Sequence, residues 1–354
     1  MVLVVRAPGR VNLIGDHTDY QDGFCLPLAI DREVVIRATP RADGRVVARS
    51  DALAGVVDMP ADGLEDARHV EPGWGRPMAA VLRMLAQPGR ISIGFDAEVT
   101  STVPVGSGLS SSAAFAVAVA ITASEIGGLA TSPQSVVRIA QAAELAATGV
   151  PCGVMDQMAS VFGRAGHALL LDCRSLDIDA IPLPPAASVA VIHSGVARRL
   201  EDSAYAQRRA ACEAAAARIG VATLRDATLE EAGDDPFARH VVSENARVLD
   251  FVTALRAGDL ERGGELMGSS HISLRDDFRV STPELDALVD ALVYEGAYGA
   301  RLTGAGFGGC VVALVATDRV DDVVARAAAR YGSATGLTPT PLVVRAVDGA
   351  GRVE

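Results

Sequence analysis

The clearest pattern in the chain is an alternation of apolar and polar positions that is followed by a continuous apolar run. Between residues 91 and 99 every second position is apolar: Ile91, Ile93, Phe95, Ala97 and Val99. This period of two predicts a half-buried strand. The Ala-rich run 113–123 leads to Gly127 and Gly128, which predicts a buried helix with a glycine stop. The segment 103–112 is therefore expected to be a loop that joins a strand to a helix N-terminus.

Weaker patterns predict the remaining elements. Residues 7–20 are rich in polar side chains and interrupted by glycines, so we expect a loop with short pieces of structure. Prolines at 182, 184 and 185 predict a boundary between domains of residues 1–182 and 183–354. The expected strands are residues 2–5, 168–172, 189–193 and 311–315. The expected helices include residues 136–147, 205–213, 240–247 and 325–329. Residues 41–78 show no informative pattern.

Composition limits the class of protein. The chain has 354 residues, is 49% apolar and carries a formal net charge of −12. This charge argues against nonspecific nucleic-acid binding, which needs a basic face. The five cysteines form no Cys-x-x-Cys pair, the N-terminus lacks a signal-peptide pattern, and no apolar run approaches the roughly 20 residues of a membrane span. We therefore expect a cytoplasmic protein with reduced thiols and no membrane partner.

The loop 103–112 has the features of a phosphate-binding segment. Gly106 and Gly108 let the backbone approach a ligand closely, and the serines at 110–112 can cap the following helix. The free N–H groups and the positive dipole end of a helix N-terminus favour an anion. A Walker loop is excluded because the chain contains no lysine, and the dinucleotide fingerprint is excluded because Ser111 replaces its third glycine. The alternative is a capped helix without a ligand.

Three other segments carry candidate chemistry. Residues 10–20 are dense in side chains that can act: Arg10, Asn12, Asp16, His17, Asp19 and Tyr20. Paired carboxylates suit a polyhydroxylated ligand because each oxygen accepts from a hydroxyl, although a solvated turn is the alternative. Asp156 stands in an apolar segment, where a carboxylate needs a partner or a role, with a helix N-cap as the alternative. The glycine-rich segment 299–310 is either a second backbone nest or a tight hairpin.

Taken in order, these segments resemble one known family. Residues 8–20 (Pro-Gly-Arg-Val-Asn-Leu-Ile-Gly-Asp-His-Thr-Asp-Tyr) resemble the signature of the galactokinases. Residues 104–113 resemble the phosphate loop of the GHMP small-molecule kinases, the superfamily that includes them. The segments 153–157, 171–176, 270–277 and 304–309 also follow the galactokinase order. The resemblance covers both halves of the chain, with only residues 41–78 and the last few dozen unmatched.

The resemblance implies a fold, a reaction and a set of site residues. The implied fold is an α+β, two-domain GHMP kinase fold, with an N-terminal domain like ribosomal protein S5 domain 2, a ferredoxin-like C-terminal domain and the active site in the cleft between them. The implied reaction is ATP-dependent phosphorylation of the anomeric hydroxyl of galactose by a monomer or weak homodimer. The residues implied to bind ATP are Pro104, Gly106, Ser107, Gly108, Leu109, Ser110, Ser111, Ser112 and Ala113, and Mg²⁺ is implied to bind to Ser112 and Glu144. The residues implied to bind the sugar are Asp16, His17, Asp19, Gly153, Asp156 and Tyr205. The implied catalytic pair is Arg10 and Asp156.

The implied mechanism depends on charge. Asp156 would orient or accept the proton of the anomeric hydroxyl, and Arg10 would stabilise both Asp156 and the transferring phosphoryl group. A carboxylate beside an arginine is a weak base, so we expect Asp156 to act chiefly by orientation, with proton transfer late.

One residue departs from the family pattern, because Asp16 stands where the family usually has glutamate. The shorter side chain keeps open a sister sugar 1-kinase acting on galacturonate, arabinose or an N-acetylhexosamine, whereas Tyr205 fits the galactokinase pattern. A non-catalytic sugar and ATP sensor is the alternative of a different class, but such a protein should have lost Asp156, Ser112 or Glu144. A serine hydrolase is disfavoured because the chain has no Gly-x-Ser-x-Gly elbow.

Overall fold

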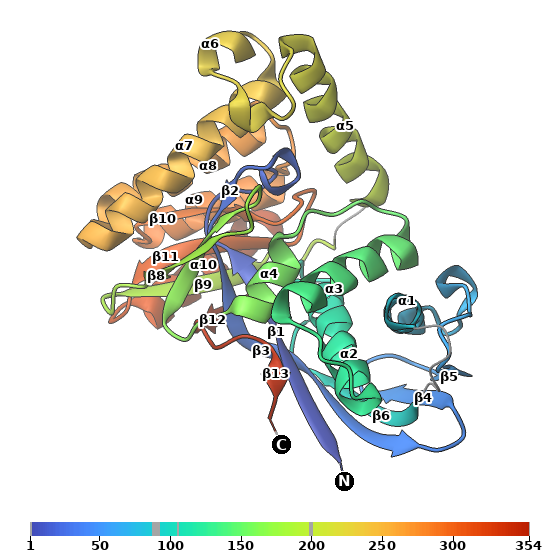
Figure 1. Ribbon diagram of the computed structural model, residues 1–354. Coiled ribbons are helices and arrows are strands. Elements are labelled where there is room, and N and C mark those ends of the chain that lie inside the picture. The colour runs from blue at the N-terminus through green and yellow to red at the C-terminus, as the bar shows by residue number, and fades with distance from the viewer. Residues whose placement is uncertain (1, 87–92, 105, 198–200, 354) are drawn as a thin grey trace.

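The protein, seen in a computed structural model that describes residues 2–86, 93–104, 106–197 and 201–353, consists of two halves that meet near the middle of the molecule (Figure 1). Helices and largely antiparallel sheets occur in both halves, so the expected α+β class is confirmed. Val105 of the glycine–serine loop and Ile91 of the expected strand lie outside the described residues.

The first half is built on a six-stranded sheet with the order β13-β1-β3-β6-β4-β5. Its strands are β1 (Leu3–Asn12), β3 (Pro27–Arg41), β4 (Arg45–Ser50), β5 (Val56–Pro60), β6 (Gly94–Ser101) and β13 (Gly351–Arg352). Among the described strands of this sheet, β4 and β6 are parallel neighbours and the other neighbouring pairs are antiparallel. Helices lie on one side of it, and α2 contacts both β1 and β3 (Figure 1).

Small side chains let the helices of this half pack closely on the sheet. They are α1 (Arg76–Leu85), α2 (Ser111–Gly127), α3 (Pro133–Thr148) and α4 (Met155–Phe162). Helix α2 buries mainly alanine and valine, and it ends at Gly128, whose φ of 60° is the left-handed conformation of a glycine C-cap. The buried helix and its glycine stop are therefore confirmed, and a smaller sheet of β2 (Phe24–Cys25), β7 (His167–Asp172) and β8 (Ile178–Pro182) completes this half.

The second half has an antiparallel four-stranded sheet with the order β10-β11-β9-β12. The strands are β9 (Ala187–His193), β10 (Gly299–Thr303), β11 (Cys310–Ala316) and β12 (Thr340–Val344). The helices are α5 (Glu201–Ile219), α6 (Leu229–Ala232), α7 (Pro236–Ala257), α8 (Leu260–Asp276), α9 (Pro283–Glu295) and α10 (Val320–Thr335). Helices separate β9 from β10 and β11 from β12, which is the βαββαβ arrangement of a ferredoxin-like fold.

The expectation of a loop over residues 7–20 is wrong for its first part. Strand β1 continues to Asn12, so Arg10 and Asn12 project from a strand. Nearly all of β1 is buried on both faces, which removes the alternation that would have marked it as a strand. Gly9 marks a close approach rather than a loop, because a Cβ there would lie 2.6 Å from the carbonyl oxygen of Leu109. Strand β1 ends at Asn12, and we call residues 13–26, which include a 3₁₀ turn at Asp19–Gln21 and the two-residue strand β2, the polar loop.

The uninformative segment 41–78 also contains regular structure. It forms β4, β5 and two short 3₁₀ turns at Ala67–His69 and Gly73–Gly75. The end of the chain returns to the first half, where β13 pairs with β1. The division into domains of residues 1–182 and 183–354 stays a prediction.

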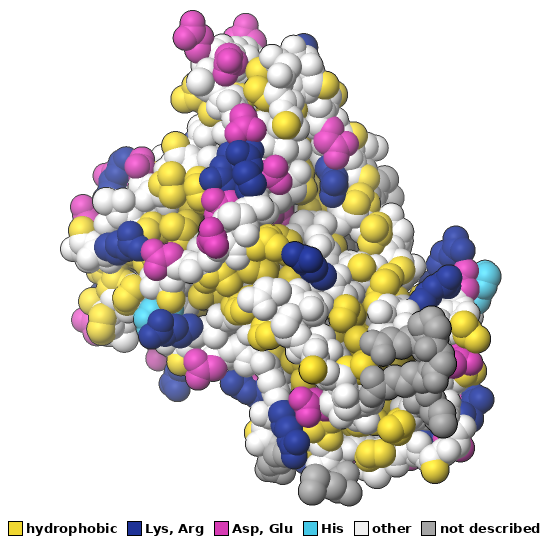
Figure 2. All heavy atoms as spheres, in the orientation of Figure 1, with side chains coloured by type: hydrophobic (Ala, Val, Ile, Leu, Met, Phe, Trp, Pro, Cys, Tyr) yellow, Lys and Arg dark blue, Asp and Glu magenta, His cyan; other side chains and the backbone are white. Residues whose placement is uncertain are grey.

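Three properties of the molecule relate to the expectations from composition. Within the described residues, none of the five cysteines takes part in a disulfide. Within the described part of the chain, every helix is too short or too polar to cross a bilayer. Acidic and basic side chains are interspersed over the face drawn in Figure 2.

Candidate active site

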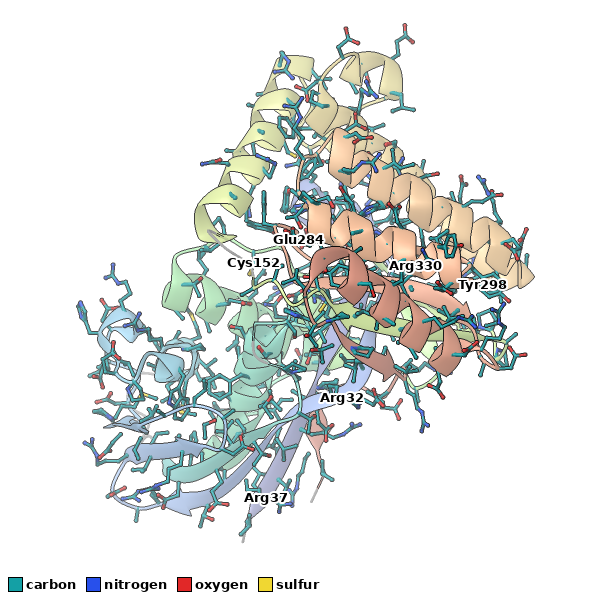
Figure 3. All side chains as sticks on the ribbon, turned by 180° about the vertical axis from the view of Figure 1, so that it is seen from behind. Arg32, Arg37, Cys152, Glu284, Tyr298 and Arg330 are labelled. Carbon is teal, nitrogen blue, oxygen red and sulfur yellow. The ribbon has the colours of Figure 1, made fainter. Side chains whose placement is uncertain are left out.

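One cavity brings together the residues that we expect to act on the sugar. It encloses about 200 Å³ and receives side chains from both halves of the molecule. Its walls are formed by Arg10, Asp16, His17, Asp19, Glu144, Val150, Cys152, Gly153, Met155, Asp156, Tyr205, Gly304 and Ala305. Cys152 lies in this wall between the lower end of α5 and the helices of the first half (Figure 3). All six expected sugar-binding residues and both expected catalytic residues therefore share one cavity.

Arg10 and Asp156 form a two-bonded ion pair in the wall of the cavity. The Nε atom of Arg10 lies 2.8 Å from Oδ1 of Asp156, and its Nη2 atom lies 2.9 Å from Oδ2. The third nitrogen, Nη1, donates to the carbonyl oxygen of Gly108 at 2.7 Å. Asp156 also accepts a short hydrogen bond from the hydroxyl of Ser110. The pair thus joins the cavity to the glycine–serine loop. Asp156 lies within the first turn of α4, so the N-cap alternative is wrong.

The N-terminus of α2 differs from the expected capped helix. Ser110 occupies the N-cap position, but its side chain accepts no capping hydrogen bond because its hydroxyl is directed to Asp156. Ser110 also has a left-handed φ of 60°, and strained non-glycine residues of this kind cluster at functional sites. The capping role expected for Ser110 is therefore wrong. The N–H groups of the first turn, which includes Ser111, Ser112 and Ala113, can instead face an anion.

Other residues of the glycine–serine loop set its shape. The hydroxyl of Ser107 donates to the carbonyl oxygen of Pro104 at 2.7 Å, and Cys310 donates its S–H to the carbonyl oxygen of Ser107. Leu109 is buried, and its carbonyl oxygen accepts from the N–H of Arg10 at 3.1 Å. A Cβ on Gly106 would meet no atom within 4 Å, so the loop is open to a ligand at that point.

Glu144 of α3 lies beside the start of α2. Burial and the nearby Asp156 raise the pKa of Glu144 to about 7, while hydrogen bonding to the Ser112 hydroxyl opposes the rise. Gln157 donates its amide to Oε2 of Glu144 at 2.6 Å, a contact that the sequence alone did not indicate. The structure thus brings Ser112 and Glu144 together, and one hydroxyl with one carboxylate is a donor set that fits Mg²⁺ completed by phosphate and water. Within the described residues, no group of three or more His, Cys, Asp or Glu side chains could hold a metal.

His17 is held with both ring nitrogens occupied. Its Nε2–H donates to the carbonyl oxygen of Ala305 at 3.3 Å, because a carbonyl can only accept, and Nδ1 then accepts from the Tyr20 hydroxyl at 3.0 Å. Burial and the neighbouring His240 lower the pKa of His17 to about 3, so the ring is neutral. The ring also packs 4.7 Å from that of Phe278. His17 therefore presents a fixed ring to the cavity rather than a free polar atom.

Asp19 and Tyr205 supply groups to the same cavity. Burial and the neighbouring carboxylates of Asp156 and Asp16 raise the pKa of Asp19 to about 7. The ring of Tyr205 lies 5.7 Å from that of His17 and edge-on to Tyr20 at 5.5 Å. The aromatic cluster is built by the start of α5 and the polar loop, which are far apart in the sequence.

Asp16 is almost fully buried at one edge of the cavity. Its Oδ2 atom lies 2.6 Å from Nη2 of Arg301, and its Oδ1 accepts from the N–H of Gly304 at 3.1 Å. Burial raises the pKa of Asp16, and the Arg301 guanidinium opposes that rise. Sequence reasoning missed Arg301, which lies on β10 within the glycine-rich segment 299–310. That segment forms a hairpin of β10 and β11, and the N–H of Gly304 donates to a carboxylate of the protein itself.

A second, mostly apolar pocket of about 210 Å³ opens beside the start of α2. Trp74 and Phe115 contribute an edge-to-face ring pair with centroids 6.2 Å apart. Ser111 and Ser112 lie in its wall, so this pocket adjoins the expected phosphate site. Sequence reasoning gave Trp74 no role, because the segment around it carries no motif.

Comparisons with known proteins agree with these features. Residues 2–40 match the galactokinase galactose-binding signature, residues 76–164 match the GHMP kinase N-terminal domain, and residues 251–334 match the GHMP kinase C-terminal domain. The chain is 46% identical to a galactokinase of Roseiflexus sp. (strain RS-1), over 99% of this chain and 93% of the relative. It is 44% identical to a galactokinase of Chloroflexus aurantiacus, over 98% of this chain and 92% of the relative.

A solved structure supports the same assignment. The crystal structure of Lactococcus lactis galactokinase complexed with galactose superimposes with a TM-score of 0.93 and 31% sequence identity, covering 99% of this chain and 95% of that one. The full-length identity to named relatives and the matching fold together decide the family. The chain belongs to the galactokinase family of the GHMP kinases.

Proposed function

We propose that this protein transfers the γ-phosphoryl group of ATP to the anomeric hydroxyl of galactose, giving galactose 1-phosphate and ADP. The observation that carries the proposal is the ion pair of Arg10 and Asp156, which borders the cavity and also contacts the glycine–serine loop through Gly108 and Ser110. A sugar hydroxyl in the cavity would therefore lie near a phosphate held by the loop.

The sugar is proposed to occupy the cavity of about 200 Å³, which is suited to one monosaccharide in size and polarity. Asp19 and Asp156 offer carboxylate oxygens to sugar hydroxyls, and Tyr205 and His17 offer ring surfaces to the C–H face of the sugar. Asp16 is largely engaged by Arg301, so we propose that it borders the far end of the sugar and limits what fits there.

ATP is proposed to lie along the glycine–serine loop with its base in the apolar pocket. The N–H groups at the start of α2 face its phosphates, and Trp74 and Phe115 supply aromatic surface for the base. Ser112 and Glu144 would hold Mg²⁺, which when bound supplies positive charge to the phosphates.

In the proposed reaction the oxygen of the anomeric hydroxyl forms a bond to the γ-phosphorus, and the bond from that phosphorus to the bridging oxygen breaks, leaving its electron pair on ADP. Asp156 orients the hydroxyl and receives its proton late in the step. Arg10 holds Asp156 in place by two hydrogen bonds and stabilises negative charge that develops on the phosphoryl group. Direct transfer of the phosphoryl group from ATP to the sugar needs no covalent enzyme intermediate. Positioning and charge stabilisation therefore account for the catalysis.

The sister sugar kinases remain the second candidate because Asp16 has a shorter side chain than the glutamate usual in the family. Arg301 is the cation near that end of the cavity, but Asp16 already occupies its Nη2 atom. This pairing favours a neutral sugar over galacturonate. Cytoplasmic location and a monomer or weak dimer stay predictions from the sequence.

The proposal is tested by measuring ATP consumption with a panel of galactose, arabinose, galacturonate and N-acetylgalactosamine, together with ³¹P NMR of the product. Galactose is expected to be the best substrate and to give a phosphate ester at its anomeric carbon. Faster turnover of another sugar would replace galactose in the proposal, and binding of sugar and ATP without turnover would favour a sensor. Running Asp16→Glu in parallel tests whether the shorter side chain alters sugar choice.

A further inference from the structure

We propose that three side chains of α7, those of His240, Glu244 and Asn245, are positioning residues that hold the polar loop in the shape needed to bind the sugar. The inference rests on the proposed function, because the polar loop carries Asp16 and Asp19 into the cavity. None of the three side chains lines that cavity within the described residues, so each acts through the loop backbone.

The three contacts lie on both sides of the residues that face the cavity. Oε1 of Glu244 accepts from the N–H of Gly15 at 3.0 Å, directly before Asp16. Nε2 of His240 lies 3.1 Å from the carbonyl oxygen of Asp16 itself. Oδ1 of Asn245 accepts from the N–H of Phe24 at 2.9 Å, at the far end of the loop. The loop is therefore fixed at its entry and its exit by one helix.

Glu244 makes the strongest of these contacts because it is ionised although it is fully buried. Burial alone would raise its pKa, but Arg247 and Arg301 lower the pKa of Glu244 to about 2. Its Oε1 also accepts from the Ser270 hydroxyl at 2.5 Å, and its Oε2 accepts from Nε of Arg247 at 2.7 Å. A hydrogen bond to a buried carboxylate is shorter and stronger than one between neutral groups. Buried ion pairs contribute little net stability to a fold. We therefore attribute the ion pair of Glu244 and Arg247 to its effect on the shape of the polar loop.

His240 is a neutral donor in this arrangement. Burial lowers the pKa of His240 to about 4, although the nearby Glu244 opposes the shift. The carbonyl oxygen of Asp16 can only accept, so the ring carries its hydrogen on Nε2. Nδ1 lies 3.0 Å from the hydroxyl oxygen of Ser273, which orients the ring plane. The tautomer and the orientation of His240 are thus both set by neighbours.

The loop and α7 approach each other so closely that glycine is required at two positions. A Cβ on Gly15 would lie 2.6 Å from the carbonyl oxygen of Phe24 and 2.8 Å from Cγ2 of Val248. A Cβ on Gly23 would lie 2.4 Å from Oδ1 of Asn245. Contacts this close leave the loop little freedom to shift along the helix.

Electrostatic repulsion within the cavity explains why the loop needs these anchors. Burial is the largest cause of the raised pKa of Asp19, and the nearby carboxylates of Asp156 and Asp16 raise it further because like charges are held close together there. Without fixed backbone contacts the loop would relax so as to separate these carboxylates. Anchors outside the cavity hold the carboxylates near one another without using the oxygen atoms that the sugar needs.

The test compares Glu244→Ala, Glu244→Gln and Asn245→Ala with the control Leu249→Ala, which alters an exposed side chain of the same helix. Amide hydrogen exchange over residues 15–24 is measured first, without sugar. We expect faster exchange at Gly15 in Glu244→Ala and at Phe24 in Asn245→Ala, and wild-type exchange in Leu249→Ala. Glu244→Gln keeps an oxygen for the Gly15 N–H and should restore most of the protection.

Steady-state kinetics supplies the second readout. We expect Glu244→Ala to raise the KM for galactose by up to about 100-fold while the KM for ATP changes less than about twofold. Unchanged exchange at Gly15, or an equal loss of affinity for sugar and ATP, would overturn the inference. Hydrogen exchange is measured without any substrate. If the protein fails to phosphorylate galactose, the proposed function is overturned, but the exchange result still decides whether α7 positions the polar loop.

Discussion

Gly153 and Asp19 are in such close contact that a Cβ on Gly153 would lie 1.6 Å from Oδ2 of Asp19. The Asp19 carboxylate therefore rests directly on the backbone of the segment before α4, which also carries Asp156. This contact joins the polar loop to the catalytic segment, and it requires glycine for reasons of space rather than backbone conformation.

Gly153→Ala is expected to displace Asp19 and to lower kcat/KM for galactose by about 100-fold, with the KM for ATP nearly unchanged. The matched control is Gly268→Ala in α8, where a Cβ meets no atom within 4 Å. That change should leave the kinetics unaltered and stabilise the helix by about 0.5–1 kcal/mol. Wild-type affinity for galactose in Gly153→Ala would show that Asp19 does not contact the sugar.

Asp156→Asn is expected to lower turnover by about 10²–10⁴-fold and to leave ATP affinity nearly unchanged. The amide is the same size as the carboxylate but lacks the charge that pairs with Arg10 and the basicity to take a proton. Single-turnover kinetics together with ATP binding separates the two effects. Asp96→Asn, which removes a partner of Arg41 outside the cavity, is the control and should remain active. Near-normal turnover would remove Asp156 from the mechanism.

Galactose binding to the free enzyme is expected to weaken as the pH falls below about 7, the value to which burial and neighbouring carboxylates raise the pKa of Asp19. Protonation removes an acceptor of sugar hydroxyls. Calorimetric titration from about pH 5 to pH 8 measures the effect, and Asp19→Asn should flatten the profile. A pH profile that is identical in the wild type and the variant would contradict the assignment.

The raised pKa of Asp19 also affects the stability of the ligand-free protein. Between the ordinary pKa of 3.8 and about 7, the folded protein retains a proton on Asp19 that the unfolded chain releases. The contribution of this group to the free energy of unfolding therefore decreases as the pH rises through that window. Asp19→Asn should remove the decrease, which thermal unfolding at several pH values measures.

Trp74→Ala is expected to raise the KM for ATP about tenfold by removing aromatic surface from the apolar pocket, while galactose affinity is retained. Leu64→Ala changes a side chain that is 81% exposed and serves as the control. Isothermal titration with ATP, and separately with galactose, distinguishes a local effect from general destabilisation. An equal loss of affinity for ATP and for galactose would argue against binding of the adenine base at Trp74.

The sequence was most informative where a polar residue interrupts an apolar segment. Asp156 could be selected because it stands in an apolar segment, whereas Arg10, 146 positions away, was one of several polar side chains in residues 10–20 and its role was implied by the family resemblance. Strand β1 was misjudged for a related reason, because burial on both faces hides the period of a strand. The glycine at position 9 looked like a loop signal, although it reflects the approach of another segment.

Residues whose role depends only on distant contacts could not be found in this way. Arg301 follows an ordinary strand pattern, and only the fold brings it to Asp16. Gln157 adjoins a predicted site residue, but its bond to Glu144 needs α3 and α4 to be placed side by side. Trp74 lies in a segment without a pattern, so its pocket became visible only after β4, β6 and α2 had been assembled.

The polar loop leaves and re-enters the molecule at one pair of strands, where Asn12 of β1 faces Pro27 of β3. It could therefore be replaced without altering the six-stranded sheet, although its strand β2 also pairs with β7 of the smaller sheet. Its fit, however, depends on the partner helix, since Gly15 and Gly23 admit only the side chains that α7 now presents. Engineering a new sugar preference will consequently require transplanting the loop together with the matching face of that helix, and an exchange of the loop alone should yield a poorly binding hybrid.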